Sequence, residues 1–194
     1  MRIVWSWLVL AGLASFGSLA FAEAVPLDKG VADISAANSK ITFVGTHSGA
    51  KPDPRTGGFG KFTGRVTIDP ATKNLTSVTA DIDTTSLFTA IPKLTDHLKT
   101  ADFLEVREYP TAKFASTKVT PGKDGTATVT GKLTLHGKTQ EISFPATVTV
   151  TAEGLTLKSD FTINRGEFGM TYGAGKVEDK VSLSVIVGEK TQAQ

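Results

Sequence analysis

A strict alternation of apolar and polar residues over positions 126–136 constrains this chain more than any other feature. One face of that segment is apolar or small, and the other carries Thr, Lys and His. The residues of the apolar face are Ala127, Val129, Gly131, Leu133 and Leu135. A period of two with one apolar face is typical of a half-buried β-strand.

The same alternation recurs in seven further segments. They lie near residues 41–43, 62–68, 78–82, 112–119, 142–150, 155–163 and 181–187. Turn signals separate these runs, among them Asp69-Pro70, His136-Gly137 and Glu153-Gly154. Because the connections are short, neighbouring strands are expected to be antiparallel. We expect about eight strands.

Three segments interrupt the alternation. Pro145 removes a ladder donor, so it marks an edge, a bulge or a break between two strands. Residues 93–101 are expected to form a short helix, because Pro92 suits a first turn and Leu94 and Leu98 lie four apart. Residues 46–60 are rich in Gly and Pro and are interpreted as a mobile loop between two strands.

Antiparallel strands with one apolar face each can fold into a two-sheet sandwich or close into a barrel. Such a barrel is filled by its own side chains or holds one small ligand. The alternation alone leaves these alternatives open.

The first 22 residues differ from the rest of the chain. After Arg2, residues 3–22 carry no charge, and the run ends in Ala20-Phe21-Ala22. A short positive start, an apolar middle and an A-x-A end indicate a cleaved signal peptide. An uncleaved membrane anchor is the alternative, since about 20 apolar residues can span a bilayer. We expect a short leader at residues 23–31 and a polar tail at 189–194.

The composition argues against several functional classes. The formal net charge of +2 offers no basis for nucleic-acid binding. The absence of cysteine excludes disulfides and thiolate sites, and for an exported protein it favours a bacterial periplasm. His47, His97 and His136 are far apart and form no zinc-binding motif. We therefore expect no metal and no cofactor.

Three segments, in order, resemble the YceI-like polyisoprenoid-binding family of periplasmic, lipocalin-like proteins. HLKTADFL at residues 97–104 is similar to the family pattern H-L-x-S-x-D-F-F-D. GKLTLHG at 131–137 is similar to its G-x-L-T-L-H-G hairpin, and INRGEFGM at 163–170 to I-N-R-x-D-F-G-M. The opening of the domain, residues 33–47, resembles the family's first strand.

The resemblance implies an all-β domain over residues 32–188, an antiparallel eight-stranded lipocalin-like barrel with a short helix and a long apolar lumen. It implies a periplasmic binding protein, not an enzyme, that stores, transports or sequesters an isoprenoid lipid such as a polyprenyl phosphate or a quinone-like molecule. Arg165 and His97 are the candidates for contact with the head group. The residues expected to line the lumen are Phe43, Val66, Ile68, Val78, Ile82, Phe114, Val129, Leu133, Leu135, Phe161, Ile163, Leu183 and Val185.

Two other functional classes stay open. One is a structural or stress protein whose barrel is plugged and holds no ligand. The other is an enzyme that acts on a lipid through His47 or His97. A homodimer is also left open.

The signal-peptide interpretation predicts that protein recovered from the periplasm begins at Glu23. Both tryptophans, Trp5 and Trp7, precede the cut, so the mature protein should show tyrosine emission only. Intact mass and a fluorescence spectrum check this expectation. A mass that retains residues 1–22, or retention in the membrane after a salt wash, would contradict it.

Overall fold

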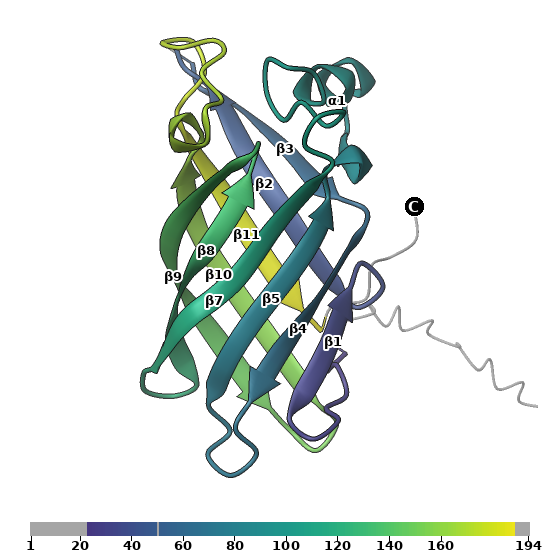
Figure 1. Cartoon of the computed structure of the whole chain (residues 1–194), viewed down its shortest axis with the longest axis vertical. Coiled ribbons are helices and arrows are strands. Elements are labelled where there is room, and N and C mark those ends of the chain that lie inside the picture. The colour runs from purple at the N-terminus through teal and green to yellow at the C-terminus, as the bar shows by residue number, and fades with distance from the viewer. Residues whose placement is uncertain (1–22, 50, 189–194) are drawn as a thin grey trace, which may run out of the picture.

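The computed structural model describes residues 23–49 and 51–188 (Figure 1). The signal peptide expected at residues 1–22 and the tail expected at 189–194 lie outside the described residues. Within the expected leader, Val25 is buried and its backbone forms an antiparallel bridge with Leu155.

The described chain forms one curled sheet of eleven antiparallel strands in the order β1-β4-β5-β7-β8-β9-β10-β11-β2-β3-β6. The strands are β1 (Val31–Ser35), β2 (Ser39–His47), β3 (Asp53–Phe59), β4 (Phe62–Ile68), β5 (Leu75–Asp83), β6 (Leu87–Thr89), β7 (Thr111–Pro121), β8 (Thr126–Leu135), β9 (Lys138–Val150), β10 (Leu155–Asn164) and β11 (Lys180–Val187). Most connections are short, as the turn signals predicted. The turn between β8 and β9, for example, has positive φ at both His136 and Gly137.

The all-β, antiparallel prediction is confirmed, but the expected count of eight strands is wrong. The eight predicted segments correspond to β2, β4, β5 and β7 to β11, and the sequence missed β1, β3 and β6. The strands β1 and β6 have five and three residues, too few for a period of two to stand out. The glycines and prolines of β3 predicted a loop, yet the strand pairs with β2 over six residues.

The glycines of β3 serve close packing rather than mobility. A Cβ atom on Gly57 would lie 2.3 Å from the ring of Phe43, its partner on β2. Only glycine lets that ring lie flat against the strand. The loop prediction therefore misinterpreted a contact as flexibility.

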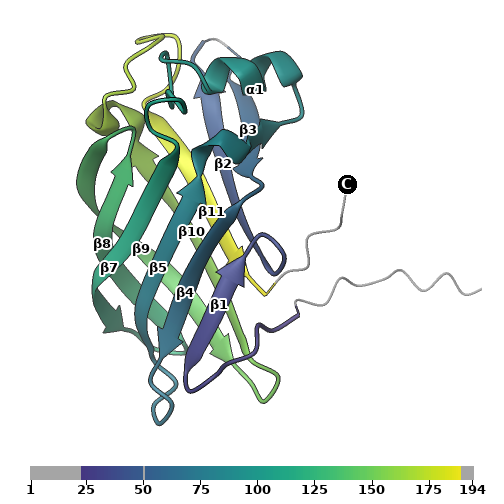
Figure 2. The same ribbon diagram turned by 45° about the vertical axis from the view of Figure 1, so that its right-hand side comes forward.

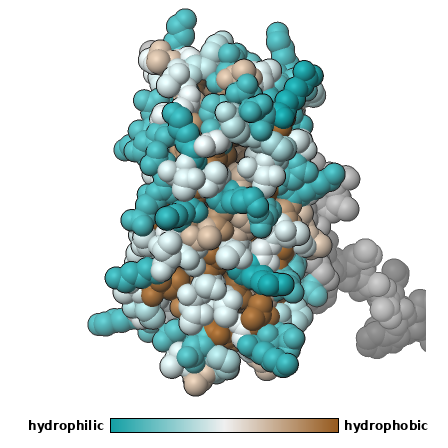
Figure 3. Space-filling view, in the orientation of Figure 1, coloured by the Kyte–Doolittle hydropathy of each residue, from teal (hydrophilic) through white to brown (hydrophobic). Residues whose placement is uncertain are grey.

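The sheet curls into a half-barrel rather than the predicted barrel closed by a continuous ladder. The strands β1 and β6 end the strand order and share no ladder in the described chain. The alternation places apolar side chains inside and polar ones outside, and the face in Figure 3 is accordingly mostly hydrophilic.

Helix α1 (Pro92–Leu98) lies at the upper end of the sheet, next to β6 (Figure 2). It begins at Pro92, one residue before the predicted start, and ends three residues before the predicted end at Ala101. The helix η1 (Thr84–Ser86) precedes β6, and η2 (Arg165–Phe168) follows β10. Among the described residues, no helix is long and apolar enough to cross a membrane.

Pro145 marks the point at which β9 and β10 stop pairing. Their ladder runs from Leu155 opposite Val150 to Lys158 opposite Thr147 and goes no further. The Pro145 carbonyl faces β10, where it accepts a hydrogen bond of 2.6 Å from the Ser159 hydroxyl. Because that edge of Pro145 has no N–H to donate, the ladder cannot continue through it. On its other edge, β9 stays paired with β8 from Lys138 to Thr147, through Pro145.

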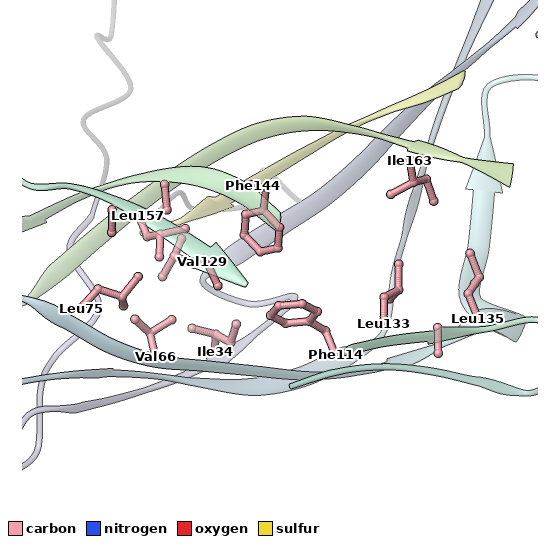
Figure 4. Close-up of a cluster of buried hydrophobic side chains, with 14 of the residues drawn as sticks. Ile34, Val66, Leu75, Phe114, Val129, Leu133, Leu135, Phe144, Leu157 and Ile163 are labelled. Atoms are coloured by element: carbon pink, nitrogen blue, oxygen red, sulfur yellow. The ribbon is translucent and has the colours of Figure 1, made fainter. Parts of the chain in front are cut away.

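The lower end of the half-barrel is filled by side chains. The strand ends at this end carry inward-facing apolar residues that are less than a tenth exposed (Figure 4). We call this group the floor; it consists of Val25, Ala32, Val66, Ile68, Leu75, Ala127, Val148, Leu155 and Val187. The floor closes the interior from below.

Arg165 organises the segment between β10 and β11 from a fully buried position. Its guanidinium group donates four hydrogen bonds of 2.7–3.1 Å to backbone carbonyls, and Nη2 lies 3.2 Å from the Asp179 carboxylate. The carbonyls belong to Met170, Tyr172, Val177 and Glu178. One buried cation thereby fixes the loop from residue 170 to residue 179.

We predict that Arg165→Gln lowers the free energy of unfolding by roughly 3 kcal/mol, because it leaves several buried carbonyls without a donor. Urea unfolding followed by circular dichroism measures this change. The exposed Arg107 supplies the control, and Arg107→Gln should change the free energy by less than about 0.5 kcal/mol. Equal stability of the two variants would show that the loop does not depend on Arg165.

Candidate binding cavity

A cavity of about 240 Å³ lies above the floor, enclosed by the curled sheet. Its wall comes mainly from the inward faces of β2, β5 and β7 to β11, with single residues or pairs from β1, β3 and β6, and with α1 and the segment after it at the upper end. Figure 4 shows Leu133, Leu135 and Ile163 at one end of this interior and Val66 and Leu75 at the other. The volume is near the lower end of the roughly 300–1,000 Å³ that is usual for ligand pockets.

Eleven of the thirteen predicted lining residues lie in the wall of this cavity. They are Phe43, Val78, Ile82, Phe114, Val129, Leu133, Leu135, Phe161, Ile163, Leu183 and Val185. Several of them, such as Phe161 and Leu183, are only half-buried although they face inward. The interior is thus accessible to solvent at this level, whereas the floor residues are buried.

The two other predicted lining residues, Val66 and Ile68, belong to the floor. They are 0% and 3% exposed and do not line the cavity. Both lie on the inward face of β4, as the alternation predicted, but near its lower end, where Ala32 and Leu75 are their strand partners. Alternation identifies the face of a strand and not the depth at which a residue lies along it.

Other wall residues were not singled out from the sequence. Ile41, Leu157 and Val181 share strand faces with predicted lining residues, and Ile142 and Phe144 share one face of β9 with each other, so alternation could have identified all five. The wall also includes residues from α1 and from irregular segments, for which a period of two gives no signal. These are Leu94, Leu98, Phe103, Leu104, Met170 and Val177.

Aromatic rings cover the gap that Pro145 opens between β9 and β10. The rings of Phe144 and Phe161 stack with centroids 4.3 Å apart and an interplanar angle of 12°. The ring of Phe114, on β7, lies against the ring of Phe144 with a centroid distance of 5.3 Å. Side-chain stacking therefore replaces backbone pairing in this part of the wall.

The deep polar groups of the wall are already engaged by the chain itself. The Ser159 hydroxyl donates to the Pro145 carbonyl, and the Arg165 guanidinium is surrounded by its four carbonyls and Asp179. Arg165, a predicted head-group contact, thus has a structural role. What the interior offers a ligand is an apolar surface.

His97, the other predicted head-group contact, lies at the upper rim and not in the cavity wall. Its Nε2 atom lies 2.8 Å from the Asp102 carboxylate. Its ring meets the edges of Phe103 and Tyr172 at centroid distances of 5.1 and 5.2 Å. This cluster joins the segment after α1 to the loop that Arg165 holds, and so covers part of the cavity.

Two basic side chains, His47 and Arg55, do reach the cavity wall near its mouth. They come from the upper ends of β2 and β3, and Arg55 forms an ion pair with Asp53. Among the described residues, no three His, Asp or Glu side chains are grouped as metal ligands would be.

Comparison with known proteins identifies relatives along most of the chain. It is 35% identical over 137 residues to a UPF0312 protein of Pseudomonas putida (strain W619), covering 68% of this chain and 71% of the relative. A UPF0312 protein of Vibrio cholerae (serotype O1, strain M66-2) is 38% identical over 135 residues, covering 70% and 69%.

Two solved structures share the fold. BcnA of Burkholderia cenocepacia superposes with a TM-score of 0.70 at 28% identity, covering 77% of this chain and 94% of BcnA. A polyisoprenoid binding domain from Saccharophagus degradans superposes with a TM-score of 0.63 at 16% identity, covering 85% of this chain and all of that domain.

The description "YceI-like domain" matches residues 33–187, which run from β1 to the end of β11. The resemblance inferred from the three sequence motifs is thus confirmed, and the chain belongs to the YceI-like domain family.

Proposed function

We propose that this protein binds one linear isoprenoid-type chain in the cavity above the floor. The observation that carries the proposal is the character of the wall, which is formed mainly by aliphatic and aromatic side chains. The deep polar groups of that wall are satisfied internally, so a polar ligand buried there would leave its own groups unpaired. An apolar chain has no polar groups to leave unpaired.

The energetics suit a chain without specific contacts. Each CH₂ group transferred from water into such a wall contributes about 0.8 kcal/mol. Several isoprene units together offset the cost of immobilising the ligand. The wall supports recognition by length and shape, and the kinship with a polyisoprenoid binding domain agrees with this proposal.

We further propose a periplasmic location, with storage, transport or sequestration as the role. The reason remains the sequence of residues 1–22, which fits a cleaved signal peptide. A cut before Glu23 would spare Val25, which belongs to the floor and pairs with Leu155. The mature chain would therefore keep its closed lower end.

Binding, rather than catalysis, is the proposal that the site favours. His97 pairs with Asp102 outside the wall, and the Ser159 hydroxyl donates to a carbonyl rather than to a base. His47 reaches the wall only near the mouth and is exposed. We propose no catalytic role for any of these residues.

Organic extraction of protein purified without added lipid tests the proposal directly. We expect mass spectrometry of the extract to find a chain lipid in stoichiometric amounts, because an apolar wall open to water favours an occupant. The extract of an unrelated protein purified in parallel is the control. An empty extract, together with no binding of added isoprenoid, would favour the ligand-free structural protein.

Enlarging a wall residue should separate a cavity from a filled core. We predict that Leu133→Trp abolishes most isoprenoid binding while the lipid-free protein keeps near-normal stability, because the added ring can occupy free volume. Titration with a fluorescent isoprenoid and urea unfolding measure the two effects.

Two control variants sharpen this experiment. Val66→Trp places the same ring in the floor, where overpacking should cost about 1–3 kcal/mol. Lys132→Ala changes the outward neighbour of Leu133 and should leave both stability and binding unchanged. Equal destabilisation by Leu133→Trp and Val66→Trp would indicate that the upper interior is as full as the floor.

A further inference from the structure

The upper ends of β2 and β3 bring a small polar group to the mouth of the apolar cavity. Phe43, Gly45 and His47 alternate along β2 on the face that lines the cavity. In the register of the two strands, Arg55 lies opposite Gly45, and Asp53 lies opposite His47. Arg55 and His47 line the cavity, so a guanidinium and an imidazole stand where the apolar wall ends.

Arg55 has N–H donors available for a ligand, whereas the guanidinium of Arg165, the other arginine of the wall, is engaged by four backbone carbonyls. Its Nη2 atom contacts the Asp53 carboxylate, and this is its one polar contact among the described residues. A guanidinium has five N–H donors in a planar fork, so Nε and Nη1 stay available. The Arg55 side chain is 42% exposed, which places it at the boundary between cavity and solvent.

Space for a ligand group lies across from this side chain. Gly45 has no side chain, and a Cβ atom built on it would meet no atom within 4 Å. The inward face of β2 is therefore open next to the guanidinium. A compact group could sit there while its chain continues downward past Phe43.

We propose that the lipid held in the cavity has an anionic head, a phosphate or a carboxylate, and that Arg55 binds it at the mouth. The inference rests on the proposed function and specifies its ligand class. An arginine fork matches the paired oxygens of either anion with two parallel hydrogen bonds. His47, two residues beyond the partner of Arg55 on the neighbouring strand, adds a second donor on the same side of the opening.

Asp53 competes with the ligand for Arg55. Its carboxylate is an anion of the same kind as the expected head group and occupies one edge of the guanidinium. Removing that charge frees the edge and also removes repulsion of an incoming anion. Substitution of Arg55 is therefore expected to weaken binding of the anionic lipid, and substitution of Asp53 to strengthen it.

The experiment compares ligands that share a chain and differ in the head. Dissociation constants are measured for geranylgeranyl phosphate against geranylgeraniol, and for oleate against oleyl alcohol, on the delipidated mature protein. We expect the anion to bind about tenfold more tightly than the alcohol of the same chain, as a partly exposed charge-assisted contact would give. A preference for phosphate alone or carboxylate alone identifies which anion the site suits.

Variants then assign that preference to Arg55. Arg55→Gln should reduce the anion-to-alcohol ratio to about one and leave alcohol binding unchanged, whereas Asp53→Asn should raise the ratio. Arg65→Gln is the matched control, because Arg65 forms the equivalent pair with Asp33 at 3.0 Å on the outer surface. The ratio in the control should equal that of the parent protein.

The outcomes distinguish this inference from the proposed function. Equal binding of anion and alcohol by the parent protein would overturn the head-group inference while leaving chain binding intact. An anion preference that persists in the Arg55→Gln variant would overturn the assignment of head-group binding to Arg55. If no ligand of either kind binds, the proposed function itself fails.

Discussion

In a curled antiparallel sheet, every second side chain of each strand points into the interior. The rest of this structure depends on which part of the interior these side chains fill completely. At the lower end the strand ends are joined by short turns, and residues such as Val66, Leu75 and Leu155 meet across the interior and exclude water. Higher up, the inward side chains of β5, β10 and β11 line a cavity instead of filling the interior. One pattern of alternation thus produces both a closed floor and an open lumen.

Polar groups inside such a wall are tolerated only where the chain itself satisfies them. Pro145 ends the ladder between β9 and β10. The Pro145 carbonyl, which has no ladder partner on β10, accepts a hydrogen bond from the Ser159 hydroxyl instead. Stacked Phe144 and Phe161 then cover the opened seam. Arg165 brings a full charge into the same wall, but four backbone carbonyls and Asp179 surround it. These arrangements keep the deep surface apolar although the sequence places a serine and an arginine there and interrupts the neighbouring ladder with a proline.

The sequence predicted what alternation can encode and missed what depends on depth or on contacts between distant segments. It identified eight of the eleven strands and the inward face on which Leu133 and Phe161 lie. It could not separate Ile68 in the floor from Ile82 in the cavity wall. They lie at opposite ends of the β4–β5 ladder, paired with Leu75 and Phe62, and alternation carries no information on that difference in level. The glycines around Gly57 predicted a mobile loop, because the ring of Phe43 that requires a glycine at this position comes from another strand and the sequence does not show that contact. For the same reason it selected Arg165 and His97 from motifs and overlooked Arg55, whose position depends on pairing within the segment interpreted as a loop.

The arrangement of the two ends gives a bound chain a direction. The floor offers only apolar surface, so the tail of an amphipathic lipid is stabilised there and its head is not. At the opposite end, the cluster of His97, Phe103 and Tyr172 covers one side of the opening, while the β2–β3 end presents Arg55 and His47 on the other. A chain that entered tail first, as proposed, would reach Val129 and Leu157 where the cavity meets the floor. The distance between these residues and the Arg55 guanidinium would then set the chain length at which head and tail are satisfied together, so length selection and head-group recognition would depend on each other.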